Sequence, residues 1–448
     1  MDISFFKRGI KVESSGPAEE PLDVDPPARV LMPLRQCVGG DCTVVVEKGE
    51  QVKAGQTLAE GAGAANADLH APFGATVAGF EQVRMPDGAE SRALVLEADP
   101  SAGTADAPAR GDPSRASFEE LRDRLARAGV VRGSREAKAL ATVIDESLSS
   151  HGVIPPTGKP VVRPVEHLAV LFCDADPHLA TASAAAAGIG ESGSELAAGI
   201  AALSRITGAE NVHLVIDRRQ HIPAAEKLAD EEDWQVHRID SLRYPNAAEP
   251  FVAKLVSGRE PPVAFRQVHE SGTLIVDAET VLDSARAVRL GKPVTERLVT
   301  VIGPAGRKVV RAALGTPLSD IVEAAGMGGS HRKVVLGGPL DGIAHHTLDH
   351  PLTKSVRAIT LFSSEQVEPF DNRPCIGCGL CVQVCPARLS PGLLSRYCEF
   401  NELERAEEAH LFNCVECGCC AYVCPAGRSM VQLMIYGKSE ILSARRAS

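Results

Sequence analysis

Residues 375–392 read CIGCGLCVQVCPARLSPG, and residues 414–427 read CVECGCCAYVCPAG. Each run spaces four cysteines as C-x2-C-x2-C-x3-C and places a proline directly after the fourth cysteine. Two residues between cysteines let a tight loop wrap three thiolates round three corners of a [4Fe–4S] cube, and glycines permit close approach of the backbone. The longer gap turns the fourth thiolate away from that loop. The two runs together predict a C-terminal domain built round two such clusters.

The expected ligands come from both runs, because in two-cluster bacterial ferredoxins the fourth cysteine of each run binds the other run's cluster. One predicted ligand set is Cys375, Cys378, Cys381 and Cys424. The other predicted set is Cys414, Cys417, Cys420 and Cys385. The clusters are expected to carry electrons, since no hydrolase motif accompanies them in the sequence, and no catalytic residue is assigned.

A pair of structural zinc sites is the alternative, but zinc ribbons use separated C-x2-C pairs and not this spacing. Cys419 lies out of register in the second run, so it is expected to pack near the cluster. Its alternative role is as a ligand in place of Cys420. Cys398 and Cys173 are expected to be ordinary thiols, the latter at the end of a strand.

The bulk composition is that of a soluble globular protein, with 44% apolar and 23% charged residues. Two to four domains are expected, because 448 residues exceed what one core organises. The net charge of −11 argues against nucleic acid as a partner, since phosphate binding needs a basic face. No run reaches the ~18–20 apolar residues of a membrane span, and the first residues lack a secretory signal. A reducing cytoplasmic setting follows, in which clustered cysteines bind metals.

Residues 1–100 are predicted to form a small β domain. Residues 42–61, CTVVVEKGEQVKAGQTLAEG, and 69–80, LHAPFGATVAGF, alternate β-branched runs with glycine turns. They resemble the barrel-sandwich fold of lipoyl and biotinyl carrier domains, but the hairpin at residues 61–70 has no lysine to modify. A structural or docking module is therefore expected. Cys37 and Cys42 form C-x4-C, without the further ligands that a metal site requires.

An α/β domain is predicted for residues 117–265. It begins with a helix whose capping box is Ser117 and Glu120. Strand-like runs at residues 166–174 and 211–217 flank helical sequence, and this alternation favours a parallel sheet.

A β-grasp-like unit is predicted for residues 270–345, because residues 298–326 read as strand, strand and helix. The ferredoxin domain follows at residues 365–440, with a helix expected between its two cysteine runs at residues 396–412. The expected fold class is thus multi-domain, with β, α/β, β-grasp and helical ferredoxin parts.

Four stretches carry a family resemblance. Residues 375–386, CIGCGLCVQVCP, and 406–426, AEEAHLFNCVECGCCAYVCPA, are the most specific. Residues 30–80, from VLMPLRQCVGGDC to LHAPFGATVAGF, and residues 336–362, LGGPLDGIAHHTLDHPLTKSVRAITLF, extend the match upstream. Together they resemble the RnfC family, a component of the Rnf electron-transport complex, over most of the chain.

The resemblance implies a peripheral subunit on the cytoplasmic face of a membrane-bound, ion-translocating complex, held there by partner subunits. It implies electron exchange between NADH and ferredoxin through other subunits. It also implies a middle domain like the flavin- and NADH-binding subunit of respiratory complex I, followed by a β-grasp module.

The implied flavin site is where this chain departs from the family pattern. The family carries a run of the type G-x-G-G-A-G-F-P-T, whereas residues 128–140 read AGVVRGSREAKAL and keep only Gly129 and Gly133. Charged residues stand where glycines let the backbone approach phosphate. The family's acidic segment survives in part at residues 174–177. FMN and NADH binding are therefore implied by the resemblance and opposed by the residues, and both outcomes stay open.

Two further patterns point less clearly to a ligand. Residues 188–193, GIGESG, fit G-x-G-x-x-G but follow an alanine run and not a strand, so a helix break is favoured over a nucleotide site. His345, His346 and His350 lack carboxylate or cysteine partners at metal-binding spacing, and loop positions are expected for them.

We therefore predict an electron-transfer subunit of a membrane-associated complex that relays electrons through two [4Fe–4S] clusters. Its expected partners are the other subunits of that complex, with ferredoxin or NADH in addition. The alternatives are a soluble FMN-dependent NADH oxidoreductase and an adaptor whose clusters only stabilise the fold.

Overall fold

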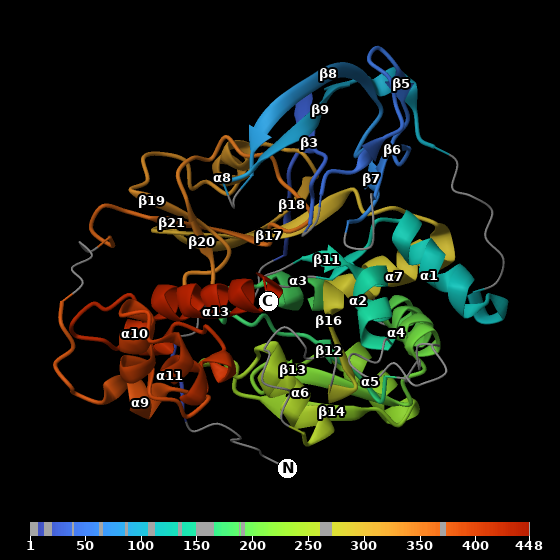
Figure 1. Cartoon of the computed structure of the whole chain (residues 1–448). Coiled ribbons are helices and arrows are strands. Elements are labelled where there is room, and N and C mark those ends of the chain that lie inside the picture. Colours follow the sequence, from blue (N-terminus) through green and yellow to red (C-terminus); the bar gives the residue numbers. More distant parts are fainter. Residues whose placement is uncertain are drawn as a thin grey trace.

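The computed structural model in Figure 1 shows the helices and strands of the chain gathered into four packed units. It describes residues 8–12, 20–37, 40–61, 66–85, 88–105, 113–132, 137–148, 165–187, 189, 193–259, 271–367 and 373–447. No described helix combines the length and the apolar character that a bilayer crossing would require.

The N-terminal unit consists of two small antiparallel sheets, in strand orders β3-β9-β8-β5 and β4-β6-β7. Inward side chains such as Val52, Leu58 and Leu69 are completely buried between them. These two sheets lie within the β domain predicted for residues 1–100, whose limits stay a prediction, since residues 10–11 and 22–23 pair with strands of other units. The strands are β3 (Arg29–Pro33), β4 (Thr43–Val44), β5 (Gln51–Val52), β6 (Thr57–Glu60), β7 (Leu69–His70), β8 (Ala75–Arg84) and β9 (Glu90–Ala98).

The second unit is a parallel sheet in the order β14-β13-β12-β16, with helices on both faces. Strands β12, β13 and β16 are buried on both faces and read as nearly continuous apolar runs, which is why the sequence predicted β12 and β13, whereas edge strand β14 is largely exposed. The strands are β12 (His167–Leu171), β13 (Asn211–Asp217), β14 (Gln235–Ile239) and β16 (Thr273–Asp277). Two short strands, β10 (Val131–Arg132) and β11 (Lys138–Ala139), form a separate hairpin.

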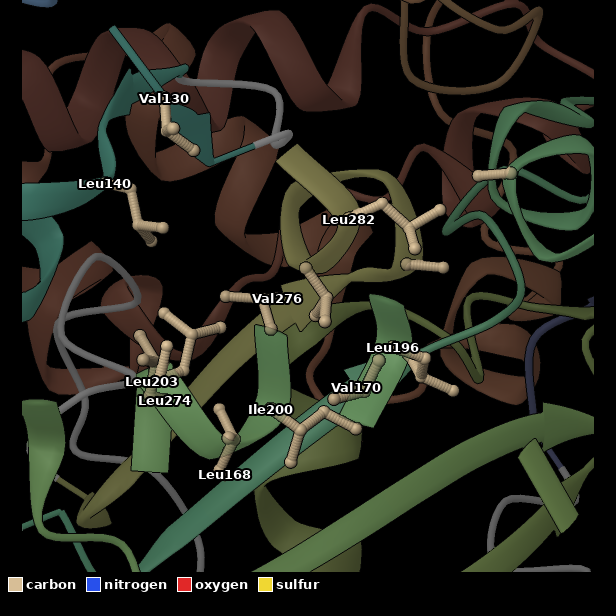
Figure 2. Packing of buried hydrophobic residues seen from close by; sticks show 14 of the residues in the cluster. Val130, Leu140, Leu168, Val170, Leu196, Ile200, Leu203, Leu274, Val276 and Leu282 are labelled. Atoms are coloured by element: carbon tan, nitrogen blue, oxygen red, sulfur yellow. The ribbon is translucent and has the colours of Figure 1, made fainter. Parts of the chain in front are cut away.

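The helices of this unit sort by face. The side chains of α4 and α7 pack on one face of the sheet (Figure 2). Those of α6 pack on the other face. Glu120 N donates to Ser117 Oγ over 3.1 Å at the start of α1, so the predicted cap is confirmed. The helices are α1 (Phe118–Arg127), α2 (Leu140–Leu148), α3 (Thr181–Ala187), α4 (Ser194–Thr207), α5 (Pro223–Glu231), α6 (Glu249–Ser257) and α7 (Ala278–Leu290).

Three histidines form a hydrogen-bonded row across this sheet. His167, His213 and His237 occupy neighbouring strands on the face that α6 covers. His167 Nδ1 lies 2.9 Å from His213 Nε2, and His213 Nδ1 lies 3.0 Å from His237 Nε2. Burial lowers the pKa of each ring, and that of His213 falls to about 4. The row is therefore neutral at pH 7.

The third unit is a six-stranded mixed sheet in the order β2-β18-β17-β21-β19-β20. The predicted strand, strand and helix at residues 298–326 are confirmed as β17, β18 and α8. Val299 and Ile321 of this unit share one core with Val52 and Leu58 of the N-terminal unit. The elements are β2 (Leu22–Asp23), β17 (Glu296–Gly303), β18 (Gly306–Ala313), α8 (Leu318–Ala324), β19 (Lys333–Leu336), β20 (Ile343–His345) and β21 (Ala358–Phe362).

The C-terminal unit is helical and holds both cysteine runs. The helix predicted across residues 396–412 is wrong, because α10 ends at Glu399 and Asn401 adopts a left-handed conformation with φ +56° before α11 starts. Leu394, Leu411 and Met434 form its buried core. Its elements are α9 (Leu380–Val384), α10 (Pro391–Glu399), α11 (Leu403–Glu408), η4 (Leu411–Asn413), α12 (Cys419–Tyr422) and α13 (Met430–Ala447).

A short N-terminal segment joins the helical unit to the α/β unit. Strand β1 (Ile10–Lys11) pairs with β15 (Arg243–Tyr244). On the other side, Gly9 N donates to Val384 O over 2.8 Å. Residues 8–12 are therefore held between two units that lie far apart in sequence.

Candidate metal centres

The first three ligand cysteines of the second run and Cys385 line one cavity. The cavity lining includes every cysteine of one predicted ligand set, namely Cys385, Cys414, Cys417 and Cys420. Apolar side chains, including Leu389 and Met434, complete the wall. The fold thus brings a cysteine of the first run next to three cysteines of the second.

Backbone amides in this cavity point at sulfur. Glu416 N donates to Cys414 Sγ, and Leu389 N donates to Cys385 Sγ, each over 3.4 Å. Glu416 and Gly418 have φ of +55° and +79°, which bends the loop so that its amides turn inward. Such donors favour a thiolate at the position that they face.

Burial opposes ionisation of these thiols in the metal-free protein. It raises the pKa of Cys414 to about 11, although the nearby Lys438 charge acts in the opposite direction. Burial also raises the pKa of Cys420, and the neighbouring Cys414 and Cys417 add to that rise. A bound metal must therefore displace these protons, as metals do at thiolate sites.

One buried lysine supports the loop. Lys438, on α13, donates from Nζ to Cys414 O over 2.7 Å and to Glu416 Oε1 over 2.8 Å. Its side chain is buried, and sequence inspection missed it because it lies outside both cysteine runs. It fixes the loop backbone and places a positive charge beside the thiolates.

The first run lies nearer the surface. Cys375 and Cys378 are exposed, and Cys381 is half-buried. A methyl group added at Gly392 would lie 3.5 Å from Cys381 Sγ and 4.0 Å from Cys375 Sγ, so both sulfurs converge on the start of α10. Gly377 N also donates to Cys375 Sγ over 3.4 Å.

Cys424 is placed beside this run by the backbone. Arg373 N, just before Cys375, donates to Ala426 O, just after Cys424, over 3.0 Å. Helices α9 and α12, which carry the middle of each run, also pack together. The crossed arrangement that the spacing predicts is compatible with these contacts.

The donor set fits iron–sulfur clusters better than single ions. A cube distributes its four thiolates over four iron atoms, whereas zinc gathers four ligands at roughly 2.0–2.3 Å from one point. Within the described ranges, no three His, Cys, Asp or Glu side chains surround a single ion position. Among the described residues, neither Cys37 and Cys42 nor the histidines at positions 345, 346 and 350 belong to a group of three or more side chains that could hold a metal ion.

Cys419 does not line the cavity, although its side chain hydrogen-bonds to Cys417, which does. Its buried thiol lies 3.8 Å from Tyr244 O and packs with Ile10 and Val12 of the N-terminal segment. Cys398 is buried against Gly437, and Cys173 is buried just beyond the end of β12. None of these three cysteines lines the cavity, and the roles predicted for them stay predictions.

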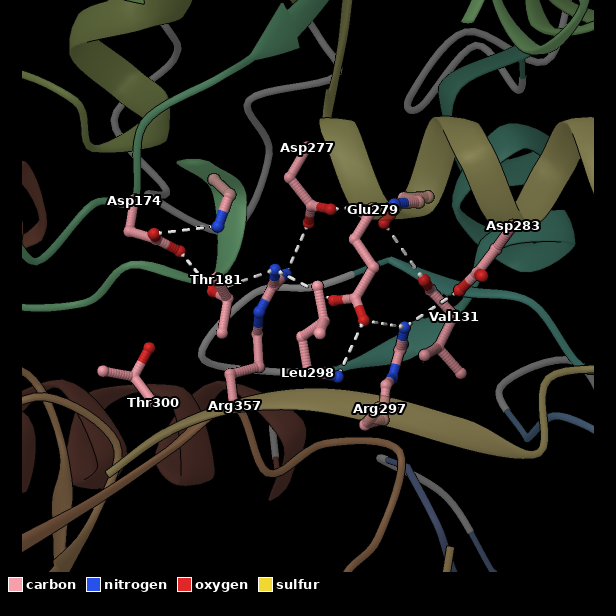
Figure 3. Close-up of polar contacts among 12 residues, drawn as sticks. Val131, Asp174, Thr181, Asp277, Glu279, Asp283, Arg297, Leu298, Thr300 and Arg357 are labelled. Carbon is pink, nitrogen blue, oxygen red and sulfur yellow. Dashed lines mark hydrogen bonds and ion pairs between the residues drawn. The ribbon is translucent and has the colours of Figure 1, made fainter. Parts of the chain in front are cut away.

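The edge of the parallel sheet where a nucleotide is expected holds a buried ion-pair network (Figure 3). Ligands of open α/β sheets bind beyond the carboxyl ends of the strands. At the end of β16, Arg357 donates to Asp277 Oδ2 over 2.5 Å and to Glu279 Oε2 over 3.3 Å. Burial alone would raise the pKa of Asp277, but the Arg357 charge holds that pKa below its ordinary value.

The surviving residues of the family's flavin pattern have structural partners here. At the end of β12, Asp174 accepts from Thr181 Oγ1 over 2.7 Å, and Asp176 accepts from Leu340 N over 2.9 Å. Asp176 Oδ2 would also lie only 2.1 Å from a methyl group at Gly338.

The absence of a side chain at Gly129 leaves room for the Lys354 ammonium group. This glycine has φ +66°, and Lys354 Nζ donates to Gly129 O over 2.8 Å and to Asp68 O over 2.6 Å. Lys354 is fully buried, which lowers its pKa to about 8. Gly133 and most of residues 188–193 lie outside the described residues. The described residues at this edge bind one another, and residues 133–136 of the run compared with the flavin pattern lie outside the described residues.

Known proteins match this chain at both ends and along its length. The RnfC barrel sandwich hybrid domain matches residues 5–101, and the 4Fe-4S dicluster domain matches residues 369–425. A component of the proton-translocating ferredoxin:NAD(+) oxidoreductase complex from Clostridium ljungdahlii is 28% identical, covering 98% of this chain and 94% of that protein. The barrel-sandwich and ferredoxin-like predictions are thereby confirmed.

Two further relatives are the corresponding components of ion-translocating oxidoreductase complexes. The one from Methanosarcina acetivorans is 28% identical and covers 98% of both chains. The one from Pseudomonas aeruginosa is 31% identical over 93% of this chain, which spans only 53% of that relative. Among solved structures, an NAD+-reducing [NiFe]-hydrogenase chain has a TM-score of 0.44 at 15% identity, covering 77% of this chain and 69% of its own.

Proposed function

We propose that this chain relays electrons through two [4Fe–4S] clusters in an ion-translocating oxidoreductase complex. The proposal follows from its homology, over nearly its whole length, to RnfC-type components of such complexes. The observation that carries the proposal is the cavity that Cys385 shares with the second run. Electron relay needs two centres close together, and crossed ligation provides this by making each run serve both clusters.

The ligand sets follow from this arrangement. Cys385, Cys414, Cys417 and Cys420 would hold the inner cluster, and Cys375, Cys378, Cys381 and Cys424 the outer one. Each cluster supplies one-electron redox chemistry when bound. The residues of this chain hold it, direct amide groups at its thiolates and bury the inner centre in apolar surroundings.

We assign the third unit as a β-grasp domain and the second as an α/β domain that does not bind a nucleotide itself. The order β18-β17-β21-β19-β20, with β17 parallel to β21, supports a β-grasp unit after the α/β domain. The α/β domain is analogous to the flavin subunit of complex I, but its ligand edge is closed by Arg357 and Lys354. We infer that electrons reach the clusters from a partner protein on the cytoplasmic side of the membrane complex.

Cluster content and redox behaviour test the proposal. The full chain, reconstituted with iron and sulfide without oxygen, should hold about eight irons and give EPR signals of reduced clusters after dithionite. Clusters that resist reduction at every accessible potential would instead support the structural-adaptor alternative. Stoichiometric FMN with NADH-to-ferricyanide activity would support the soluble flavoenzyme alternative.

A further inference from the structure

The first cysteine run is more exposed than the second. Cys375 and Cys378 are exposed, whereas Cys414 and Cys420 of the second run are buried. Ile376, which lies between the two exposed cysteines, is 70% exposed. The outer centre of the proposed pair is therefore the one that another protein can approach.

The segment 373–398 is basic in an acidic protein, and the next residue, Glu399, is paired with Arg428. Residues 373–398 contain three arginines and no aspartate or glutamate, although the whole chain has a net charge of −11. All three arginines, Arg373, Arg388 and Arg396, are exposed. Arg396 lies on α10, the helix whose first turn touches the sulfurs of Cys375 and Cys381.

Apolar side chains accompany these charges. Leu380 begins α9, and Leu393 lies in the first turn of α10 beside the sulfurs; both are exposed. Figure 1 shows α9 and α10 at the outer edge of the molecule. Exposed apolar groups rimmed by charge mark contact sites for other proteins. The first-run face is defined here as Arg373, Ile376, Cys378, Leu380, Leu393 and Arg396.

We propose that the first-run face is the docking surface for an acidic one-electron carrier protein, and this rests on the proposed function. Complementary charge speeds the encounter, and the small apolar centre allows the short-lived contact typical of redox partners. In each encounter one electron leaves the reduced carrier and enters the oxidised outer cluster. The carrier is oxidised by one electron and the cluster reduced by one, with no bond or proton change.

Stopped-flow reduction tests this proposal. The reconstituted full chain is mixed with a small acidic bacterial ferredoxin reduced by dithionite, and the second-order rate is measured against ionic strength. Arg396→Glu should slow reduction ~10-fold or more at low salt, because it removes electrostatic steering. The difference should vanish near ~0.5 M salt, where charges are screened within several ångström. Cytochrome c, a basic carrier, should show the opposite salt dependence as an oxidant.

Matched variants elsewhere on the same unit provide the controls. Arg405→Glu reverses an exposed arginine on α11, and Phe400→Ser removes a side chain that is 68% exposed, close to the 70% of Ile376. Both controls should leave the ferredoxin rate within ~2-fold, whereas Ile376→Ser should lower it at every ionic strength.

The outcomes separate docking from relay. A rate that does not depend on ionic strength, or control variants that slow reduction as much as Arg396→Glu, would overturn the docking surface. In that case, clusters that a small reducing dye can still reduce would show that the relay function does not depend on this docking surface. Clusters that the dye cannot reduce would instead remove the relay function itself. Iron content and EPR signals of each variant show that its clusters are assembled.

Discussion

Cys385 is the cysteine of the first run that lines the cavity of the second. Cys385→Ala should therefore remove the inner cluster and spare the outer one. Iron content should fall from about eight to about four per chain, and EPR should retain one of the two cluster signals. Loss of the outer cluster alone would disprove crossed ligation.

Cys419→Ala is the matched control for that experiment. Its thiol is buried beside Tyr244 and does not line the cavity, so both clusters should persist. Cys419 also follows directly on the loop of the second run, which makes it a stringent control for local disturbance.

Gly129 tolerates no side chain. An alanine Cβ would lie 2.2 Å from Lys354 Nζ and 2.3 Å from Asp68 O, at a φ of +66°. Gly129→Ala should lower the free energy of unfolding by about 2–4 kcal/mol, from left-handed strain and overpacking together. Gly258, with φ +69° and no atom within 4 Å of its Cβ position, is the control, and Gly258→Ala should cost about 1 kcal/mol. Chemical denaturation of both variants compares the costs, and equal costs would contradict the role of Lys354.

For single residues, the sequence predicts roles that depend on neighbours along the chain and not those that depend on contacts between distant segments. Spacing alone predicts three ligands in each run, because each loop must wrap its own cluster, and the crossed fourth ligand of each set stays a prediction. Lys354 and Gly129 are 225 residues apart, and no local pattern connects them. Lys438 likewise reaches the second loop from α13 and carries no motif of its own.

Among the elements, the histidine row across β12, β13 and β14 makes stability depend on pH. An unfolded histidine has a pKa near 6.5, while burial lowers that of His213 to about 4. The folded state binds fewer protons between these values, so its stability is complete above pH 6.5 and is lost as the pH falls toward 4. The exposed Glu166 and Arg259 charges beside His167 act in opposite directions on its pKa.

Thermal unfolding at pH 7.5 and pH 5 measures this loss. His213→Asn should reduce the drop in melting temperature between the two pH values. His410→Asn, at an exposed position, should leave that drop unchanged. Both variants keep the clusters, so any loss of clusters in acid affects the two equally. An unchanged drop in His213→Asn would show that the row does not control the acid response.

Elements were predictable where one periodicity or cap dominated. The apolar run of β13 and the Ser117 cap of α1 are both local signals, and both are confirmed. The break at Asn401 was missed because the surrounding residues are good helix formers. The left-handed turn is stabilised by Glu402 N, which donates to Tyr397 O over 2.8 Å across it.

For the whole molecule, the closed edge of the parallel sheet predicts the cofactor content. The purified, reconstituted chain should contain about eight irons but only substoichiometric flavin. Arg357 ties the α/β unit to its neighbour at the carboxyl end of β16, the edge where open α/β sheets bind ligands, and Lys354 makes a second tie at Gly129. Acid extraction followed by chromatography measures FMN, and one FMN per chain would contradict this closure.

The overall architecture was only partly predictable. Each unit has a local signature, and the order of units along the chain follows from these signatures. The joint core of the N-terminal unit and the six-stranded sheet could not be foreseen, because Val52 and Val299 meet only in the folded chain. Domain limits remain predictions for the same reason.

The N-terminal segment also gives biosynthesis an order. Residues 8–12 leave the ribosome early, but their partners Tyr244 and Val384 are made much later. The segment has no complete binding partner until α9 has been translated. The seam between the α/β and helical units therefore cannot close until α9 has been made.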